Sequence, residues 1–247
     1  MGTIKFDFSG ENYAITGASS GIGRQIALEL SQAGAKVLAM GRNEERLNSL
    51  KNEGGGKIFI KSFDICESLY LENAISDFVN QHGKLNGGVH AAGISDITPF
   101  RNYDNEIVKK IMDVNFWAGM NLLKLITRSK FGESGTSTVL LSSVAAISPA
   151  KGMFAYSASK AAIDSAIRSI SREIASKRHR VNSVLPGWVI SPMTDKLGAS
   201  SDLQSILAKY SLGAGKVEDV SSIVLFLLSS ASNWITGSNF VIDGGWG

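Results

Sequence analysis

The chain of 247 residues has very little of several residue types, and each shortage excludes something. Its single cysteine, Cys66, cannot form a disulfide within the chain, which favours a reducing compartment. Only 4 prolines are present, and no Pro/Ser-rich stretch or charge run divides the chain, so we expect one domain over residues 1–247. No run of about 18 apolar residues occurs, and we therefore expect no segment that spans a membrane.

An excess of charge of one sign is also missing. The 25 Lys and Arg residues against 22 Asp and Glu residues leave a net charge of +3, too weak to indicate nucleic-acid binding. The 3 histidines, His82, His90 and His179, lack metal-ligand spacing with Cys66 or with a carboxylate pair, so no metal site is expected. The first residues, "MGTIKFDFSG", have no apolar signal core, and we expect a cytoplasmic protein with neither nucleic acid nor membrane as partner.

Short apolar runs alternate with longer amphipathic segments along the chain. The runs that read as strands are 12–16, 36–40, 57–61, 87–91, 137–142, 180–185 and 239–243. Helical patterns lie between them at 21–33, 43–53, 67–82, 103–130, 153–178 and 217–230. Several strands are nearly all apolar, which is typical of strands buried on both faces of a parallel sheet. The alternation predicts an α/β fold, a single-domain Rossmann-type doubly wound parallel sheet of about seven strands with helices on both faces.

Two segments do not follow this rhythm. Residues 191–212 are long, rich in Ser and Gly and only partly helical in pattern, and loops of this length in a compact domain are usually functional. The basic residues are scattered except for "SKRHR" at 176–180. We interpret that cluster as the C-terminal cap of a helix, where the dipole favours cations.

The first expected strand runs into "TGASSGIG", which carries Gly17, Gly21 and Gly23 and opens a helix. Glycines let the backbone turn tightly and approach a pyrophosphate, while the helix N-terminus offers free N–H groups to the phosphates. Ser19 and Ser20 can add hydroxyl donors. A plain Gly-rich turn is the alternative, but the strand before it and the helix after it favour a dinucleotide loop.

The second strand ends in "LAMGRNEERL", where an NAD site would place an acidic residue about 20 residues after the glycines. That position falls near Gly41, and Arg42 follows it. A guanidinium fork suits a 2′-phosphate, so we expect NADP(H) in preference to NAD(H), with a solvated turn residue as the alternative for Arg42. Glu44 and Glu45 are expected to begin the next helix.

The stretch "FAYSASKAAIDSA" places Tyr156 and Lys160 four residues apart, on one face of a helix. An ammonium near a phenol favours the phenolate and is expected to lower the pKa of the phenol from about 10. A tyrosine with such a pKa can act as general acid or base near neutral pH. The small residues around the pair leave room for a nicotinamide ring and a substrate. A surface Tyr/Lys pair on an Ala-rich helix is the alternative when this stretch is taken alone.

Several motifs occur in order at familiar spacings: "TGASSGIG", "AAG" at 91–93, "DVNFWAG" at 113–119, "LSSVAA" at 141–146, "YSASK" at 156–160, "PG" at 186–187 and "ITGSNFVIDGG" at the C-terminal end. With them, the chain resembles the short-chain dehydrogenase/reductase (SDR) family over essentially its whole length. Within the family it looks most like the group that contains the 3-oxoacyl-[acyl-carrier-protein] reductases. The resemblance implies an NADP(H)-dependent oxidoreductase that reduces a carbonyl, with a 3-oxoacyl thioester as the leading substrate, and a homotetramer.

The resemblance also implies roles for four catalytic residues. Ser143 matches the serine that binds the substrate carbonyl, and Ser142 is the competing candidate. Asn115 matches an asparagine that holds a water linked to Lys160. The implied relay runs from Tyr156 through a ribose hydroxyl, Lys160 and a water to Asn115.

The cofactor site is expected mainly within 12–115, and the catalytic and substrate part mainly within 137–247, with 191–212 as the substrate loop. The residues assigned to the cofactor are Gly17, Ser19, Ser20, Gly21, Ile22, Arg42, Asn43, Asp64, Ile65, Ala92, Gly93, Tyr156, Lys160, Pro186, Gly187, Val189, Ser191 and Met193.

Some residues depart from the family pattern. "HAAG" stands where the family often has "NNAG", and we interpret His90 as strand-end packing or an adenosine-side contact. "SLGAGKVEDV" at 211–220 loses an Arg and two prolines of the usual pattern, which puts the substrate-side loop in doubt. Trp246 looks exposed in the sequence, and we expect a neighbouring subunit to cover it.

Two other functions remain open. One is a reductase or dehydrogenase for a steroid, sugar, quinone or other small ketone. The other is a non-catalytic dinucleotide-binding sensor or structural subunit, against which the complete set of four catalytic residues argues.

Overall fold

A seven-stranded sheet forms the centre of the computed structural model, which describes residues 4–194 and 207–246. All neighbouring strands are parallel, and their order is β3-β2-β1-β4-β5-β6-β7. The strands are β1 (Asn12–Thr16), β2 (Lys36–Gly41), β3 (Ile58–Ser62), β4 (Leu85–His90), β5 (Gly132–Leu141), β6 (Arg180–Pro186) and β7 (Asn239–Ile242). The predicted doubly wound parallel sheet is therefore confirmed.

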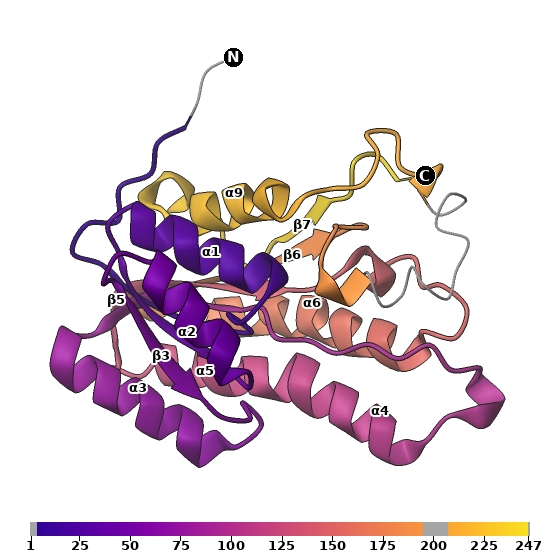
Figure 1. Ribbon diagram of the computed structural model, residues 1–247, viewed down its shortest axis with the longest axis horizontal. Coiled ribbons are helices and arrows are strands. Elements are labelled where there is room, and N and C mark those ends of the chain that lie inside the picture. The colour runs from indigo at the N-terminus through magenta and orange to yellow at the C-terminus, as the bar shows by residue number, and fades with distance from the viewer. Residues whose placement is uncertain (1–3, 195–206, 247) are drawn as a thin grey trace.

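Helices cover both faces of this sheet (Figure 1). One face carries α1 (Gly21–Gln32), α2 (Glu44–Glu53) and α9 (Val217–Leu228). The other carries α3 (Ser68–His82), α4 (Asn105–Met112), α5 (Ala118–Ile126) and α6 (Phe154–Ile174). Every residue of β1 and β6 is buried, as two helical layers require.

The switch in chain direction lies between β1 and β4. From β1 the chain builds one half of the sheet, adding β2 and then β3. It then crosses back to form β4 on the other side of β1, and β5 to β7 continue outward from β4. Thr16 and His90, the last residues of the two strands, pair across this point. Ligands of such sheets bind in the crevice beyond the carboxyl ends of the strands, so this edge is where a site is expected.

The helix expected over 103–130 is interrupted. Between α4 and α5 lies a π-helical turn, Asp113–Trp117, and the Ala118 N–H donates to the Asp113 carbonyl, five residues back. A π-helical turn changes the backbone partners without removing helical side-chain periodicity, so the apolar pattern gave no sign of it.

The interpretation of "SKRHR" as the cap of the helix before it is confirmed only for its first residues. A 3-10 turn, Ala175–Lys177, continues the helix that ends at Ile174, and Arg178 caps that turn in the left-handed conformation. Arg180, by contrast, is the buried first residue of β6. Its Nη1 donates to the Leu227 carbonyl at 2.9 Å, and its Nη2 donates to the Ser229 carbonyl at 3.1 Å. The guanidinium therefore caps α9, a helix far away in sequence, which no local pattern could indicate.

Within 4–194 and 207–246, no helix has both the length and the apolar character needed to cross a bilayer. The same residues contain no group of three or more His, Cys, Asp or Glu side chains that could hold a metal ion. Much of the expected substrate loop, residues 195–206, lies outside the described residues.

Candidate active site

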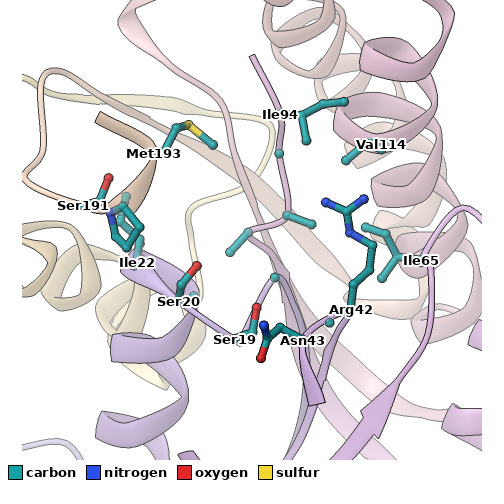
Figure 2. A pocket seen from close by; sticks show the side chains of 18 of the residues that line it. Ser19, Ser20, Ile22, Arg42, Asn43, Ile65, Ile94, Val114, Ser191 and Met193 are labelled. Atoms are coloured by element: carbon teal, nitrogen blue, oxygen red, sulfur yellow. The ribbon is translucent and has the colours of Figure 1, made fainter. Parts of the chain in front are cut away.

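A cavity of about 320 Å³ lies at the carboxyl ends of β1, β2 and β4. Figure 2 shows several of the side chains around it. From the predicted cofactor residues, the structure brings together Gly17, Ser19, Ser20, Gly21, Ile22, Arg42, Asn43, Asp64, Ile65, Ala92, Gly93, Ser191 and Met193.

The three glycines of the loop after β1 have different roles. Gly17 has φ +71°, and a Cβ there would stand 2.5 Å from the Ala92 nitrogen. A Cβ on Gly23 would stand 2.5 Å from the Gly17 carbonyl oxygen. These two glycines are therefore required for the loop to pack on itself and on the segment after β4.

Gly21, the first residue of α1, faces the cavity. It has φ +56°, and the nearest atom to an added Cβ would be the Ser191 Cβ, 3.6 Å away. The first turn of α1 therefore points its unpaired N–H groups and its positive dipole end into open space. This cradle fits the pyrophosphate of a dinucleotide.

Arg42 lies at the far end of this cavity. Figure 2 shows its side chain extending away from Asn43, toward Ile65 and Val114. The Asn43 Oδ1 accepts the Arg46 N–H at 2.8 Å and so caps α2. Arg46, which the sequence analysis missed, also lines the cavity, and its spacing of four residues from Arg42 was the available signal.

A second cavity, of about 410 Å³, adjoins the first. Ile22, Gly93, Ser191 and Met193 line both. The second cavity also brings together the predicted residues Ser143, Tyr156, Lys160, Pro186, Gly187 and Val189. Trp188, Tyr210 and Trp246 line it as well, and the sequence analysis assigned none of them to the site.

The two serines after β5 have different surroundings. Ser142 is buried, and its hydroxyl lies 3.1 Å from the Lys160 carbonyl oxygen and 3.0 Å from Asp164 Oδ2. Ser143 is the more exposed of the two, and it lines the second cavity together with Tyr156. Of the two candidates, Ser143 is therefore the one placed to meet a ligand together with the phenol.

The expectation that Lys160 lowers the pKa of Tyr156 is wrong for this geometry. Burial raises the pKa of the phenol, and the Ser143 hydroxyl opposes that rise. The Lys160 Nζ lies 5.7 Å from the centre of the Tyr156 ring and donates to the Leu141 carbonyl at 2.6 Å. The ammonium is thus held at the end of β5 rather than at the phenol oxygen.

A buried carboxylate lies one helical turn after Lys160. Asp164 Oδ1 accepts from the Ser183 hydroxyl at 2.7 Å and from Asn239 Nδ2 at 3.2 Å. Burial lowers the pKa of Lys160 to about 8, and the negative charge of Asp164 opposes that fall. The site therefore contains a lysine that titrates near physiological pH, a feature often found at active sites.

Asn115 is fully buried and lies behind the two cavities, lining neither. Its Oδ1 accepts the Ile94 N–H at 2.8 Å, and its Nδ2 donates to the Ile94 carbonyl at 3.0 Å and to the Ser159 hydroxyl at 2.9 Å. A Cβ on Gly93 would stand 3.5 Å from both Asn115 Oδ1 and Lys160 Nζ. Both atoms therefore lie on the side of Gly93 toward which a side chain would project.

The expectation for Trp246 requires correction. This side chain is half-buried within its own chain and stacks on Tyr210, with ring centres 6.1 Å apart. Two other tryptophans are exposed, Trp234 at 99% and Trp117 at 54%.

The depressed pKa of Lys160 predicts how stability depends on pH. The unfolded chain keeps this lysine charged up to about pH 10.5, whereas the folded chain releases the proton near pH 8. Between pH 8 and 10 the unfolded chain therefore binds more protons than the folded chain, and the contribution of Lys160 to the free energy of unfolding rises with pH. The free energy of unfolding of the wild type should rise by about 2 kcal/mol relative to Lys160→Met over that interval. Urea unfolding at both pH values measures it, with the exposed Lys151→Met as control, and equal pH dependence of Lys160→Met and wild type would contradict it.

Comparison with known proteins agrees with this architecture. The family described as enoyl-(acyl carrier protein) reductase matches residues 17–247. A 3-oxoacyl-[acyl-carrier-protein] reductase FabG of Rickettsia felis is 35% identical over 97% of this chain and 98% of its own. An L-xylulose reductase of Caenorhabditis elegans is 31% identical over 98% of this chain and 97% of its own.

A solved structure from Brucella melitensis, titled short-chain dehydrogenase/reductase SDR:glucose/ribitol dehydrogenase, is also similar. It has a TM-score of 0.92 and 28% identity over 99% of both chains. The predicted resemblance is thus confirmed, and the chain belongs to the short-chain dehydrogenase/reductase family of oxidoreductases, which bind a nicotinamide dinucleotide.

Proposed function

We propose that the protein is an NADP(H)-dependent reductase that converts a carbonyl into an alcohol. The leading candidate for the substrate is a 3-oxoacyl thioester. The observation that carries the proposal is that Ser143 and Tyr156 both line the second cavity, which adjoins the cradle at Gly21. One oxygen atom of a substrate can meet both hydroxyls there. The carbonyl carbon is then directed toward the wall that both cavities share.

The first cavity and this shared wall hold the cofactor in our proposal. Gly17, Ser19, Ser20 and Gly21 receive the pyrophosphate, Asp64 and Ile65 the adenine, and Pro186 to Met193 the nicotinamide end. When bound, the dinucleotide supplies the hydride. The division of the chain into a cofactor part at 12–115 and a catalytic part at 137–247 is part of the same proposal.

Tyr156 is the general acid of the reduction. Because burial raises the pKa of its phenol, it remains protonated at neutral pH and can donate to the oxygen on which negative charge develops. Ser143 donates a hydrogen bond to the same oxygen. Lys160 contributes a buried positive charge on the same face of α6, and Asn115 holds the backbone at Ile94 behind it.

The walls of the second cavity support a substrate with an apolar body. Its lining includes the large apolar side chains of Ile97, Val144, Met153, Trp188 and Trp246. An acyl chain fits such a wall better than a polyhydroxylated sugar does. The similarity to the Rickettsia reductase supports the same class, whereas the similarity to L-xylulose reductase supports the alternative of a small ketone or sugar.

The first prediction concerns the proton donor. Tyr156→Phe keeps the ring but removes the hydroxyl, so kcat should fall by roughly 10²–10⁴-fold while NADPH still binds. Ser143→Ala should lower kcat by roughly 10²-fold through loss of one hydrogen bond to the charged oxygen. The measurement is NADPH oxidation with a 3-oxoacyl thioester, a 2-enoyl thioester and a ketose.

Tyr70→Phe is the matched control, because Tyr70 is exposed at the start of α3, away from the second cavity. It should leave kcat unchanged. Near-normal turnover in Tyr156→Phe would overturn the mechanism, and a wild type that reduces only the enoyl thioester would overturn the substrate class.

The second prediction concerns the choice of NADPH over NADH. Arg42→Ala should weaken NADPH binding by roughly 10- to 100-fold and leave NADH nearly unaffected, because a charge-assisted contact to the 2′-phosphate is lost. Arg46→Ala tests the second cation of the cavity in the same way, and the exposed Arg172→Ala serves as control. Fluorescence titration gives both affinities. A wild type that binds NADH more tightly than NADPH contradicts the proposal.

We also propose a cytoplasmic homotetramer, since two separate areas expose apolar side chains. Phe100, Ile107 and Trp117 are exposed on and beside α4 and α5, and Trp234 and Val241 are exposed near and on β7. Two different surfaces can form the two kinds of interface of a tetramer built from two-fold dimers. Light scattering at micromolar concentration should give the mass of four chains, and Trp117→Glu should reduce it. A monomeric wild type would contradict the assembly.

A further inference from the structure

His90, at the end of β4, is fully buried and uses both ring nitrogens. Its Nδ1 lies 2.8 Å from the Thr16 hydroxyl, and its Nε2 lies 3.1 Å from the Val114 carbonyl oxygen and 3.2 Å from that of Asn115. Because carbonyl oxygens only accept, Nε2 carries the proton and donates to them, and Nδ1 accepts from Thr16. Burial, with the charge of Lys160, lowers the pKa of His90 to about 3, so the ring is neutral at physiological pH.

The two carbonyls that His90 reaches belong to the π-helical turn Asp113–Trp117. In a regular α-helix the Ala118 N–H would donate to the Val114 carbonyl, but here it donates to Asp113. The Nε2–H of His90 supplies a donor to the Val114 carbonyl in its place. A buried carbonyl needs such a donor, so this ring stabilises the irregular turn relative to a regular helix.

Asn115 binds back to the segment that follows β4, the strand that ends at His90. Its amide pairs with the N–H and carbonyl of Ile94, four residues after His90. Two side chains thus join this part of the chain to the π-helical turn. His90 reaches from the end of β4 to the turn, and Asn115 reaches from the turn to Ile94. A shift of the turn would move the Asn115 amide relative to Lys160.

The helix that follows is shaped to admit the ring. A Cβ on Gly119 would stand 2.8 Å from His90 Cδ2 and 3.1 Å from Cγ. Gly119 is the second residue of α5, so the start of α5 packs directly on the imidazole. The ring, the glycine and the turn form one packed unit.

We propose that His90 is a positioning residue, whose Nε2–H holds the π-helical turn and thereby fixes the Asn115 amide behind Lys160. The effect on turnover rests on the proposed function, because Asn115 influences the reaction only through the lysine. His90 itself touches neither cavity.

A double-mutant cycle tests this with NADPH and an accepted ketone. His90→Leu removes the donor and should lower kcat by roughly 10- to 100-fold, because small misplacements in a catalytic site have effects of this size. NADPH affinity should stay within about threefold, and His90→Gln, which retains an N–H of similar reach, should recover most of kcat. In an Asn115→Ala background, His90→Leu should have little further effect, because the two residues act as one unit.

His179→Leu is the matched control. His179 is also buried and accepts the Thr136 N–H at 3.2 Å, but neither it nor Thr136 contacts Asn115. It should reduce stability and leave kcat near that of the wild type. Multiplicative losses in the double variant, or normal kcat in His90→Leu, would overturn the proposal.

Amide hydrogen exchange at Ile94 provides a readout that requires no substrate. Its N–H donates to Asn115 Oδ1, so exchange there should accelerate in His90→Leu and not in His179→Leu. If the wild type reduces no ketone, the proposed function fails, and this exchange rate alone decides the role of His90. If His90→Leu does not fold, His90→Ala, which likewise lacks a donor, gives the same comparison, and unchanged exchange overturns the proposal.

Discussion

The burial of one ammonium group organises the active-site edge of this protein. Lys160 is only 4% exposed, and a buried charge is destabilising unless polar partners surround it. The Leu141 carbonyl accepts a hydrogen bond from the ammonium at the point where β5 ends, which ties α6 to the centre of the sheet. Asp164, one turn later, supplies the opposite charge and is itself held by Ser142 and Ser183. The end of β5, the middle of α6 and the start of the second cavity therefore share one polar network.

The same constraint separates the roles of the two serines. Ser142 serves the buried network, so its hydroxyl points into the protein. Ser143, one residue later in an extended backbone, lies on the opposite side and meets Tyr156. Alternation along an extended chain thus places one hydroxyl under the charge and the next beside the phenol.

The parts of the site that depend on local rules could be predicted from the sequence. The glycine loop, the Tyr156–Lys160 spacing and the alternation of strands and helices each follow from backbone geometry over a few residues. Features that depend on contacts distant in sequence could not. Arg180 caps a helix that begins 37 residues later, and the π-helical turn depends on a histidine 24 residues before Val114. The pKa of Tyr156 belongs to this second group, because burial and a neighbouring serine decide it rather than the lysine four residues on.

When one buried polar side chain takes the place of another in a family motif, the residues packed around it must change as well. A histidine at position 90 is larger than the asparagine of the common motif, and its ring occupies space that any side chain at position 119 would need. The larger imidazole reaches the carbonyls of Val114 and Asn115 in the π-helical turn. In a regular α-helix, backbone N–H groups would donate to these carbonyls. The replacement therefore changes more than strand-end packing, because the ring connects the switch point of the sheet to the segment that carries Asn115. Single-residue departures from a family motif at this edge are best understood through the backbone groups that they satisfy.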